Sequence, residues 1–194
     1  SDKTTSNVYS IIQGALWCKG YSVGSGISQN FYSGTGNAIK KLKADMGIGG
    51  GSTVTLDIMK ALLSMQQFVL LKHYGGTTTV RNIQQKINKE YKNYTGIIPC
   101  DGLYGREMNK ALIQILQSLE GYSPNDATGY FGNGTRSRLK KITSSNSSSY
   151  GKWVWLAKAI LNCLGYTCVQ NNSWNSDFES NLSKFQEDYK ISVS

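Results

Sequence analysis

The stretch CDGLYGREMNKALIQILQ, residues 100–117, contains a turn followed directly by an amphipathic run. Asp101 and Gly102 are typical turn residues, because Asp bonds to nearby backbone and Gly adopts a positive φ without strain. Apolar residues then recur every three or four positions over residues 104–115, which is the period of one helix face. Glu107 falls in the first helical turn, where the helix dipole stabilises a negative charge by about 0.3–1 kcal/mol. The stretch therefore predicts the start of a helix.

The same turn has three chemical interpretations, and the sequence favours none of them. A calcium loop needs oxygen ligands at alternating positions, whereas only Glu107 adds a carboxylate near Asp101. A phosphate loop of the Walker type needs GxxxxGK followed by Ser or Thr, which the chain lacks. A catalytic pair of Asp101 and Glu107 would follow the two-carboxylate logic of glycosidases, but related turns elsewhere in the chain lack both residues. We prefer a structural turn whose backbone N–H groups are still able to line a ligand groove.

The chain around this turn contains an internal repeat. SIIQGALWCKGY (10–21) aligns with WLAKAILNCLGY (155–166), and VRNIQQKINKEY, starting at residue 80, is a looser copy. A second set shares one frame of apolar residues at helical spacing: FYSGTGNAIKKL (31–42), YGREMNKALIQI (104–115) and WNSDFESNLSKF (174–185). A third segment, GSTVTLDIMKAL (51–62), aligns with TGYFGNGTRSRL (128–139). Each unit is therefore expected to run helix, Gly-rich loop, helix, Gly-rich turn, helix.

Two polar segments separate the units. KHYGGTTT (72–79) and TSSNSSSYG (143–151) are rich in Gly, Ser and Thr and lack periodicity, as linkers do. The sequence thus predicts an all-α fold of three small three-helix bundles in tandem. Their expected ranges are 1–73, 78–142 and 150–194, and the third unit lacks its last turn and helix.

The repeated motifs are IIQGALWCKGY, CDGLYGREMNKALIQILQSLEGY and KFQEDYKI. Their pattern resembles the peptidoglycan-binding domain-1 family of bacterial wall modules, over nearly the whole chain. Two departures are ISQNFYSGTG in place of an Asp-Gly turn, and Met108 in place of Thr. The resemblance implies three-helix modules that hold wall hydrolases on peptidoglycan. ATGYFGNGTRSRL also resembles repeats attached to glycoside-hydrolase-like barrel domains of Gram-positive bacteria and their phages, so a longer parent protein is expected to carry such a domain.

The net charge and the hydropathy of the chain limit the classes of binding partner to be expected. Lys and Arg number 21 against 12 Asp and Glu, giving a net charge of +9, and the mean hydropathy is −0.35. A basic surface favours polyanions such as nucleic acid, anionic membrane, or the teichoic acids and carboxylates of a bacterial wall. The positive residues are scattered, so we expect no nucleic-acid partner, and no apolar run reaches the roughly 20 residues of a membrane span. The polar start SDKTTSNVYS, without Met or a signal-peptide apolar region, is expected at a processing site.

The cysteines and the single histidine argue against a metal site. The cysteines are Cys18, Cys100, Cys163 and Cys168, with no CxxC pair, and His73 is the one histidine. Either the thiols are small buried side chains, or one disulfide joins Cys163 to Cys168. Cys18 and Cys163 share a repeat position, which favours packing for both. His73 is expected at a helix C-terminus, where the dipole favours it.

Candidate binding residues lie where the second-helix turn and the final turn of the second unit are expected to meet. They are Arg106, Asn109, Tyr130, Asn133 and Arg136. Arg pairs with carboxylates such as those of stem peptides, and Asn bonds to acetamido and amide groups. Five other aromatics occupy repeat positions that indicate core packing: Tyr21, Phe31, Tyr104, Trp153 and Trp174.

The sequence predicts a non-catalytic peptidoglycan-binding module that targets an attached hydrolase domain to the wall. No Ser or Cys nucleophile has an evident base and the carboxylates are dispersed, so we expect no enzyme activity, no cofactor and no metal. The expected partner is peptidoglycan or another anionic wall polymer, with no membrane contact. The expected location is secreted and wall-associated, or that of a phage lysis protein. Two alternatives remain: a wall hydrolase with its catalytic residues in this chain, and a basic helical nucleic-acid binder.

Overall fold

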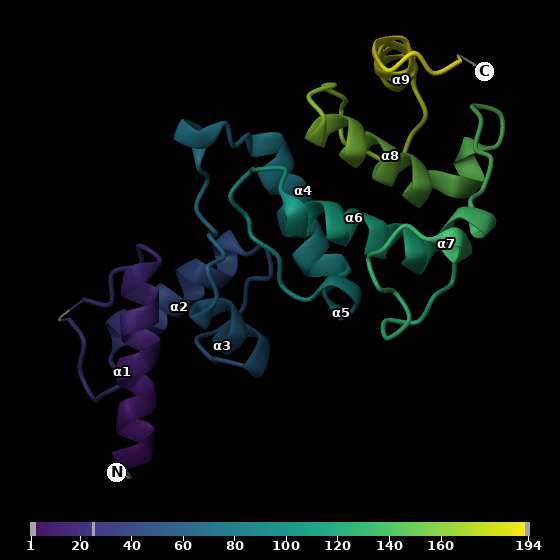
Figure 1. The fold of residues 1–194 in the computed structure, drawn as a ribbon. Helices are drawn as coiled ribbons and strands as arrows, with labels where there is room; N and C mark the ends of the chain where they lie inside the picture. Colours follow the sequence, from purple (N-terminus) through teal and green to yellow (C-terminus); the bar gives the residue numbers. More distant parts are fainter. Residues whose placement is uncertain (1–2, 25, 193–194) are drawn as a thin grey trace.

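A computed structural model of the chain describes residues 3–24 and 26–192, and every regular element within these ranges is a helix. The prediction of an all-α fold is confirmed. The helices succeed one another along an elongated molecule, from the N-terminal helix at one extremity to the C-terminal helix at the other (Figure 1). The predicted unit ends at residues 1 and 194 lie outside the described residues.

The first three helices enclose one core. They are α1 (Lys3–Cys18), α2 (Ser33–Asp45) and α3 (Leu56–Leu63), and α1 contacts both of the others. Leu16, Ile39 and Leu42 are completely buried between them. Fully burying a side chain of this size stabilises the fold by about 1.5–3 kcal/mol, so this cluster is what holds the three helices together.

The next four helices lie on both sides of the turn at residues 100–105, two before it and two after it. They are α4 (Thr78–Glu90), α5 (Lys92–Thr95), α6 (Arg106–Leu119) and the short α7 (Asn133–Arg138). The predicted helix start is confirmed: Gly102 has a φ of 81°, Gly105 is the N-cap of α6, and Glu107 lies in its first turn. α6 ends before Gly121, whose φ of 86° is the left-handed conformation typical of a helix end.

The last two helices are α8 (Gly151–Cys163) and α9 (Ser176–Asp188). The side chain of Asn175 caps α9 by accepting a hydrogen bond from the Phe178 N–H at 3.1 Å. Phe178, Val154 and Leu161 are buried where α8 and α9 meet. α9 ends at Asp188, and two residues later Lys190, a non-glycine residue, has a φ of 54°.

Successive groups of helices pack against one another. Trp155 and Leu156 of α8 are buried in the same core as Ile83 of α4 and Leu112 of α6. Cys100, from the loop before α6, is buried in the core of the first three helices. The described cores therefore do not divide the chain at the predicted unit boundaries, and that division stays a prediction.

A polar network also joins α2 to α4. Arg81 contacts the Asp45 carboxylate at 2.8 Å and donates to the carbonyl of Cys100 at 3.0 Å. The Tyr21 hydroxyl donates to the other carboxylate oxygen of Asp45 at 2.9 Å, and burial is the main cause that raises the pKa of this Tyr21 hydroxyl. The side-chain amide of Asn88 in α4 donates to the carbonyl of Met46, the residue after Asp45. These partly buried bonds fix how α4 lies on the first group.

Three side chains pin the loop that follows their own helix. Gln13 in α1 accepts from the Ser28 N–H and donates to the Asn30 carbonyl. Gln84 in α4 accepts from the Gly102 N–H and donates to the Asp101 side chain. Lys158 in α8 donates to Asn171 and Asn175. The three lie at one aligned position of the proposed repeat.

The structure corrects the prediction that all five repeat-position aromatic side chains lie in the core. Tyr21 is 2% exposed, but Phe31 and Tyr104 are each 40% exposed, and Trp153 and Trp174 are only partly buried. Phe31 and Tyr104 precede α2 and α6, so their rings lie over the helix entrance at the rim of the core. The apolar spacing placed them on the correct helix face but could not show that they lie beyond its buried part.

The two predicted linkers are ordered by hydrogen bonds. The first contains the 3-10 helix η1 (Lys72–Tyr74), and its Thr77 N–H donates to the carbonyl of Gly102 at 2.9 Å. The second contains the 3-10 helix η2 (Ser147–Tyr150), which runs directly into α8. His73 lies in η1, and its ring contacts the Tyr74 ring edge to face. The helix in which it lies is therefore a single 3-10 turn of three residues.

The four cysteines are free thiols, which settles the two alternatives against a disulfide between Cys163 and Cys168. Cys100 and Cys168 are buried and Cys163 is partly buried, whereas Cys18 is exposed. The packing interpretation thus fails for Cys18, because the α1 face that carries it is not covered. Burial raises the pKa of the Cys100 and Cys163 thiols to about 12.

Candidate functional site

A groove lies between the segment that follows α7 and the exposed side of α9. Its volume is about 590 Å³. We call it the Trp174 groove, and define it by the residues that line it: Lys141, Ile142, Thr143, Ser144, Trp174, Glu179, Leu182, Ser183 and Gln186. One wall is thus loop and the other is helix, and the wall residues combine an indole, hydroxyls, an amide, an ammonium and a carboxylate.

Trp174 is held in a fixed orientation at one end of this groove. Its Nε1–H donates to Glu179 Oε1 at 2.6 Å, and its ring meets Phe178 edge to face, with 4.8 Å between centroids. Phe178 is itself buried under α8. A partly exposed indole anchored in this way presents an apolar surface beside polar groups, which is the combination that sugar faces and their hydroxyl edges need.

The loop wall of the groove has its own local structure. The Thr143 N–H donates to Asn146 Oδ1 at 2.9 Å, and the Asn146 amide donates back to the Lys141 carbonyl at 3.2 Å. The Ser147 hydroxyl donates to the Ser144 carbonyl at 2.9 Å. The loop is therefore shaped by its own Asn and Ser side chains before any ligand arrives.

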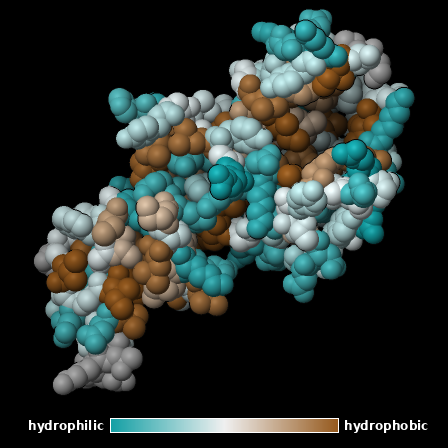
Figure 2. All heavy atoms as spheres, viewed as in Figure 1, coloured by the Kyte–Doolittle hydropathy of each residue, from teal (hydrophilic) through white to brown (hydrophobic). Residues whose placement is uncertain are grey.

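An apolar hollow continues the Trp174 groove toward α8. Its volume is about 330 Å³, and it shares Ile142, Trp174 and Leu182 with the groove. In Figure 2, hydrophobic residues gather in the hollow between α9 and α8. Polar and apolar sections are thus joined end to end, with Trp174 at the junction.

The structure places the five predicted binding residues on exposed surface along α6 and α7. Arg106 and Asn109 lie in the first turn of α6, where Asn109 accepts from the Tyr104 hydroxyl at 2.9 Å. Tyr130 is 75% exposed, and Arg136 lies over the Phe131 ring. The remaining residue, Asn133, begins α7.

The turn before α7 does fold back along α6. A Cβ added at Gly129 would collide with Lys110, the residue after Asn109, and Gln114 of α6 donates to the Ala127 carbonyl at 3.0 Å. The two turns thus come near each other, but Asn109 and Arg136 each contact a side chain of their own turn. That the five residues bind a ligand stays a prediction.

The sequence did not single out the residues of the Trp174 groove. The repeat position of Trp174 predicts a core residue, and the sequence predicts no separate role for Glu179 or Gln186. Trp174 leads the same apolar frame as Phe178, Leu182 and Phe185, so the spacing carries no signal that separates the indole from the core.

The family model for the FadG/YbfG, PGDB-like domain matches residues 73–194, which include α4 to α9 and the whole Trp174 groove. The chain belongs to this family. PGDB denotes a peptidoglycan-binding-like domain, and this chain is therefore placed among peptidoglycan-binding-like domains.

Two Bacillus subtilis proteins are similar in sequence. YbfG is 45% identical over 165 residues, covering 84% of this chain and 22% of YbfG. FadG is 34% identical over 197 residues, covering 100% of this chain and 34% of FadG. The chain thus spans about a fifth to a third of the length of these relatives. No solved structure matches it.

The described residues contain neither a cluster of metal-ligating side chains nor a membrane-spanning helix. Within residues 3–24 and 26–192, no three His, Cys, Asp or Glu side chains gather in a way that could hold a metal ion. In the same ranges, no helix has the length and apolar character needed to cross a membrane.

Proposed function

We propose that this chain is a non-catalytic module that binds peptidoglycan through the Trp174 groove. The observation that carries the proposal is the anchored, partly exposed Trp174 at the wall of a groove of about 590 Å³, within the stretch that matches a peptidoglycan-binding-like family. The indole supports stacking on an N-acetylated sugar. Thr143, Ser183 and Gln186 supply hydrogen bonds to its hydroxyl and acetamido groups.

The groove chemistry favours binding over cleavage. Among the residues described as lining it, Glu179 is the only acid, and its Oε1 is engaged by the Trp174 N–H. Glycosidases use two carboxylates, one as an acid and one as a base or nucleophile. We therefore propose that any hydrolase activity belongs to a domain attached to this module in a longer protein, which the module holds on the wall. This function places the protein outside the cell membrane, secreted or released in lysis.

The net charge of +9 supports retention on an anionic wall. Two sources of anions are present there: teichoic acid phosphates and the carboxylates of peptidoglycan. A groove that recognises sugar by stacking predicts binding that persists when the teichoic acid is removed and weakens only moderately in salt. A nucleic-acid binder would instead show a steep loss of DNA affinity with salt.

The test is retention of the full chain on purified peptidoglycan, before and after teichoic acid is stripped. We expect retention on both. Ser183→Trp, which fills the groove, should lower affinity at least tenfold, and Trp174→Ala should do the same. Ser180→Trp is the matched control, because Ser180 is exposed on the same helix outside the groove. It should bind normally.

Two results would reject this function. One is a wild-type chain that is not retained on either wall preparation, or that loses all retention with the teichoic acid. The other is equal loss in Ser183→Trp and Ser180→Trp, with both variants folded by circular dichroism. Clearing of a wall suspension by this chain alone would show that it is an enzyme.

A further inference from the structure

The first helix of the second group, α4, packs on the end of α2. Arg81 binds the Asp45 carboxylate at 2.8 Å, and the Gln85 side chain donates to the Asp45 carbonyl at 2.9 Å. A Cβ added to Gly47, two residues past the end of α2, would lie 2.5 Å from Gln85 Cβ. This close approach defines the first junction between successive groups of helices.

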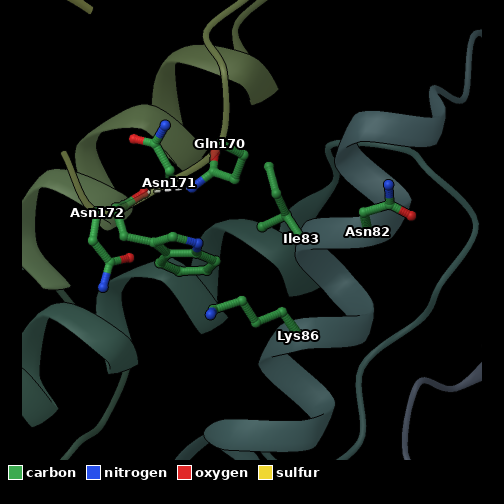
Figure 3. A pocket seen from close by; sticks show the side chains of 7 residues that line it. Asn82, Ile83, Lys86, Gln170, Asn171 and Asn172 are labelled. Carbon is green, nitrogen blue, oxygen red and sulfur yellow. Dashed lines mark hydrogen bonds between the residues drawn. The ribbon is translucent and has the colours of Figure 1, made fainter. Parts of the chain in front are cut away.

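A second junction joins α8 to α4 and α6. Four α8 residues lie in or against the core that the three helices share: Trp155, Leu156, Ala159 and Cys163. Figure 3 shows the pocket of about 270 Å³ beside this junction, where Ile83 and Lys86 point from α4 toward the loop that follows α8, while Asn82 points away. In both junctions, the first helix of a group is covered by the group before it.

The corresponding side of α1 is not covered in this way. Gln13 in α1 and Lys158 in α8 hold one aligned position and both pin the loop that follows them, which fixes the register of the two helices. In this register, four α1 residues correspond in order to the four α8 residues of the second junction: Ser10, Ile11, Gly14 and Cys18. Ile11 is 51% exposed, whereas Leu156 at the aligned position is buried.

Trp17 extends this open side of α1. It holds the position of Asn88 in α4, whose side-chain amide donates to the Met46 carbonyl at the end of α2. The Trp17 indole is 59% exposed. We define the α1 face by four residues: Ile11, Gly14, Trp17 and Cys18. Exposed apolar residues that gather on one helix side are typical of a protein contact surface.

At the other extremity of the molecule, α9 ends as α2 ends. Both helices have 13 residues. The Tyr166 hydroxyl donates to the Asp188 carboxylate at 2.8 Å, as the Tyr21 hydroxyl donates to Asp45 at 2.9 Å, and the two pairs hold aligned positions. The end of α9 therefore reproduces the structure on which α4 docks.

The end of α9 is nevertheless open to solvent. Tyr189 is the C-cap of α9 and is 58% exposed, whereas Met46, the C-cap of α2, is completely buried. We define the α9 end by six residues: Tyr166, Phe185, Asp188, Tyr189, Lys190 and Ile191. One extremity of the chain thus presents an unoccupied first-helix face, and the other presents an unoccupied second-helix end.

The two open surfaces are complementary at the point of closest approach. At the first junction, the small residue is Gly47 and the large residue is Gln85. Lys190 holds the position of Gly47 and has the same left-handed backbone, and Gly14 holds the position of Gln85. The small and large partners are therefore exchanged, and Gly14 leaves room for the Cβ of Lys190.

We propose that the α1 face of one copy of this chain docks on the α9 end of a second copy. The two surfaces lie at opposite extremities of the molecule (Figure 1), so the contact is head to tail and builds an open chain of copies. The residues that define the two surfaces differ from those that line the Trp174 groove. The proposal therefore does not rest on the proposed function, and the groove stays open in the assembly.

The test is sedimentation equilibrium of the full chain in reducing buffer, since Cys18 is an exposed thiol. The weight-average mass should exceed twice the monomer mass of 21.4 kDa at about 500 µM, and fall toward it on dilution. Ile11→Glu and Tyr189→Glu change exposed side chains on the two surfaces, and each variant alone should stay monomeric. An equimolar mixture should form dimers that grow no further, because each variant keeps one intact surface.

Tyr130→Glu is the matched control, because Tyr130 is an exposed aromatic residue before α7, outside both surfaces, and it should assemble as wild type. Exchanging the residues at the closest approach tests the register. Gly14→Gln should fold, since a Cβ at Gly14 would make an ordinary contact of 3.7 Å with Ile27, but it should stay monomeric because it meets Lys190. Adding Lys190→Gly recreates the Gly47–Gln85 combination and should restore assembly.

Several results would overturn the inference, with every variant shown to be folded by circular dichroism. They are a wild type that stays monomeric at the highest concentration, equal loss of assembly in Tyr130→Glu, a mixture of the two surface variants that does not associate, and a double variant that does not recover. Dimers of Tyr189→Glu alone would show that the α1 face pairs with itself, which also contradicts a head-to-tail contact.

Discussion

Gly102 occupies a backbone conformation that the surrounding structure makes obligatory. Its φ is 81°, and a Cβ placed on it would lie 2.5 Å from the Thr77 carbonyl oxygen and 2.5 Å from Leu70 Cδ1. Gly102→Ala should therefore destabilise the chain by about 3 kcal/mol, combining left-handed backbone strain with a forced shift of Thr77. Urea unfolding followed by circular dichroism measures this.

Gly105, three residues on, is the matched control. It has an extended φ of −124°, and a Cβ there would meet nothing within 4 Å. Gly105→Ala should cost less than about 1 kcal/mol, the loss of a favourable N-cap residue. Equal costs for the two substitutions would show that the turn is not held by the close approach of Thr77.

At the residue scale, the sequence is informative where the residue type itself reports the geometry. Asp101-Gly102 predicted a turn with positive φ because few other residue pairs suit one, and the structure confirms it. Lys158 carried no such signal. Its burial depends on Asn171 and Asn175, which reach it from a loop whose path no local pattern specifies.

At the scale of elements, the position of α4 on the first three helices depends on Arg81. This guanidinium binds Asp45 and the carbonyls of Phe68 and Cys100, all within 3.0 Å. Arg81→Met keeps the apolar stem and removes every one of these bonds, so we expect a loss of about 2–3 kcal/mol in the free energy of unfolding. Chemical unfolding of the purified variant measures it.

The exposed Lys86–Glu90 pair supplies the comparison for Arg81. Glu90→Ala removes a solvated pair one turn apart, and should cost less than about 0.5 kcal/mol. A cost for Arg81→Met as small as that of Glu90→Ala would mean that the Arg81 bonds do not hold α4 in place, and that apolar packing and the Asn88 bond do.

Helix positions were largely predictable, and the contacts between helices were not. The apolar spacing of REMNKALIQILQSL defines α6, and Met108, Leu112 and Ile115 are buried as that spacing predicts. α7 is only six residues long, because NGTRSR offers a single buried side chain, Thr135, to hold it. The Trp174 groove joins residues 141–144 to α9, segments whose contact no periodicity encodes.

At the scale of the whole molecule, the shared core of α4, α6 and α8 predicts that these helices unfold together. Leu156 of α8 is 3% exposed and lies in one cluster with Ile83 and Leu112. Leu156→Ala should cost about 3 kcal/mol through the lost contacts and the cavity left behind. Because the cavity opens on all three helices, amide hydrogen exchange should accelerate in α4 and α6 as well as in α8.

Mass spectrometry of peptic fragments distinguishes this coupling from independent bundles on tethers. Exchange that rises only within residues 150–192 would show that α8 and α9 open as a separate unit, as the sequence-based division expects. Val169→Ala is the control, since Val169 is 62% exposed and its loss should change exchange in none of the helices. Coupled opening would also mean that the cavity of about 270 Å³ between α4 and the loop that connects α8 to α9 exists only while both parts are folded.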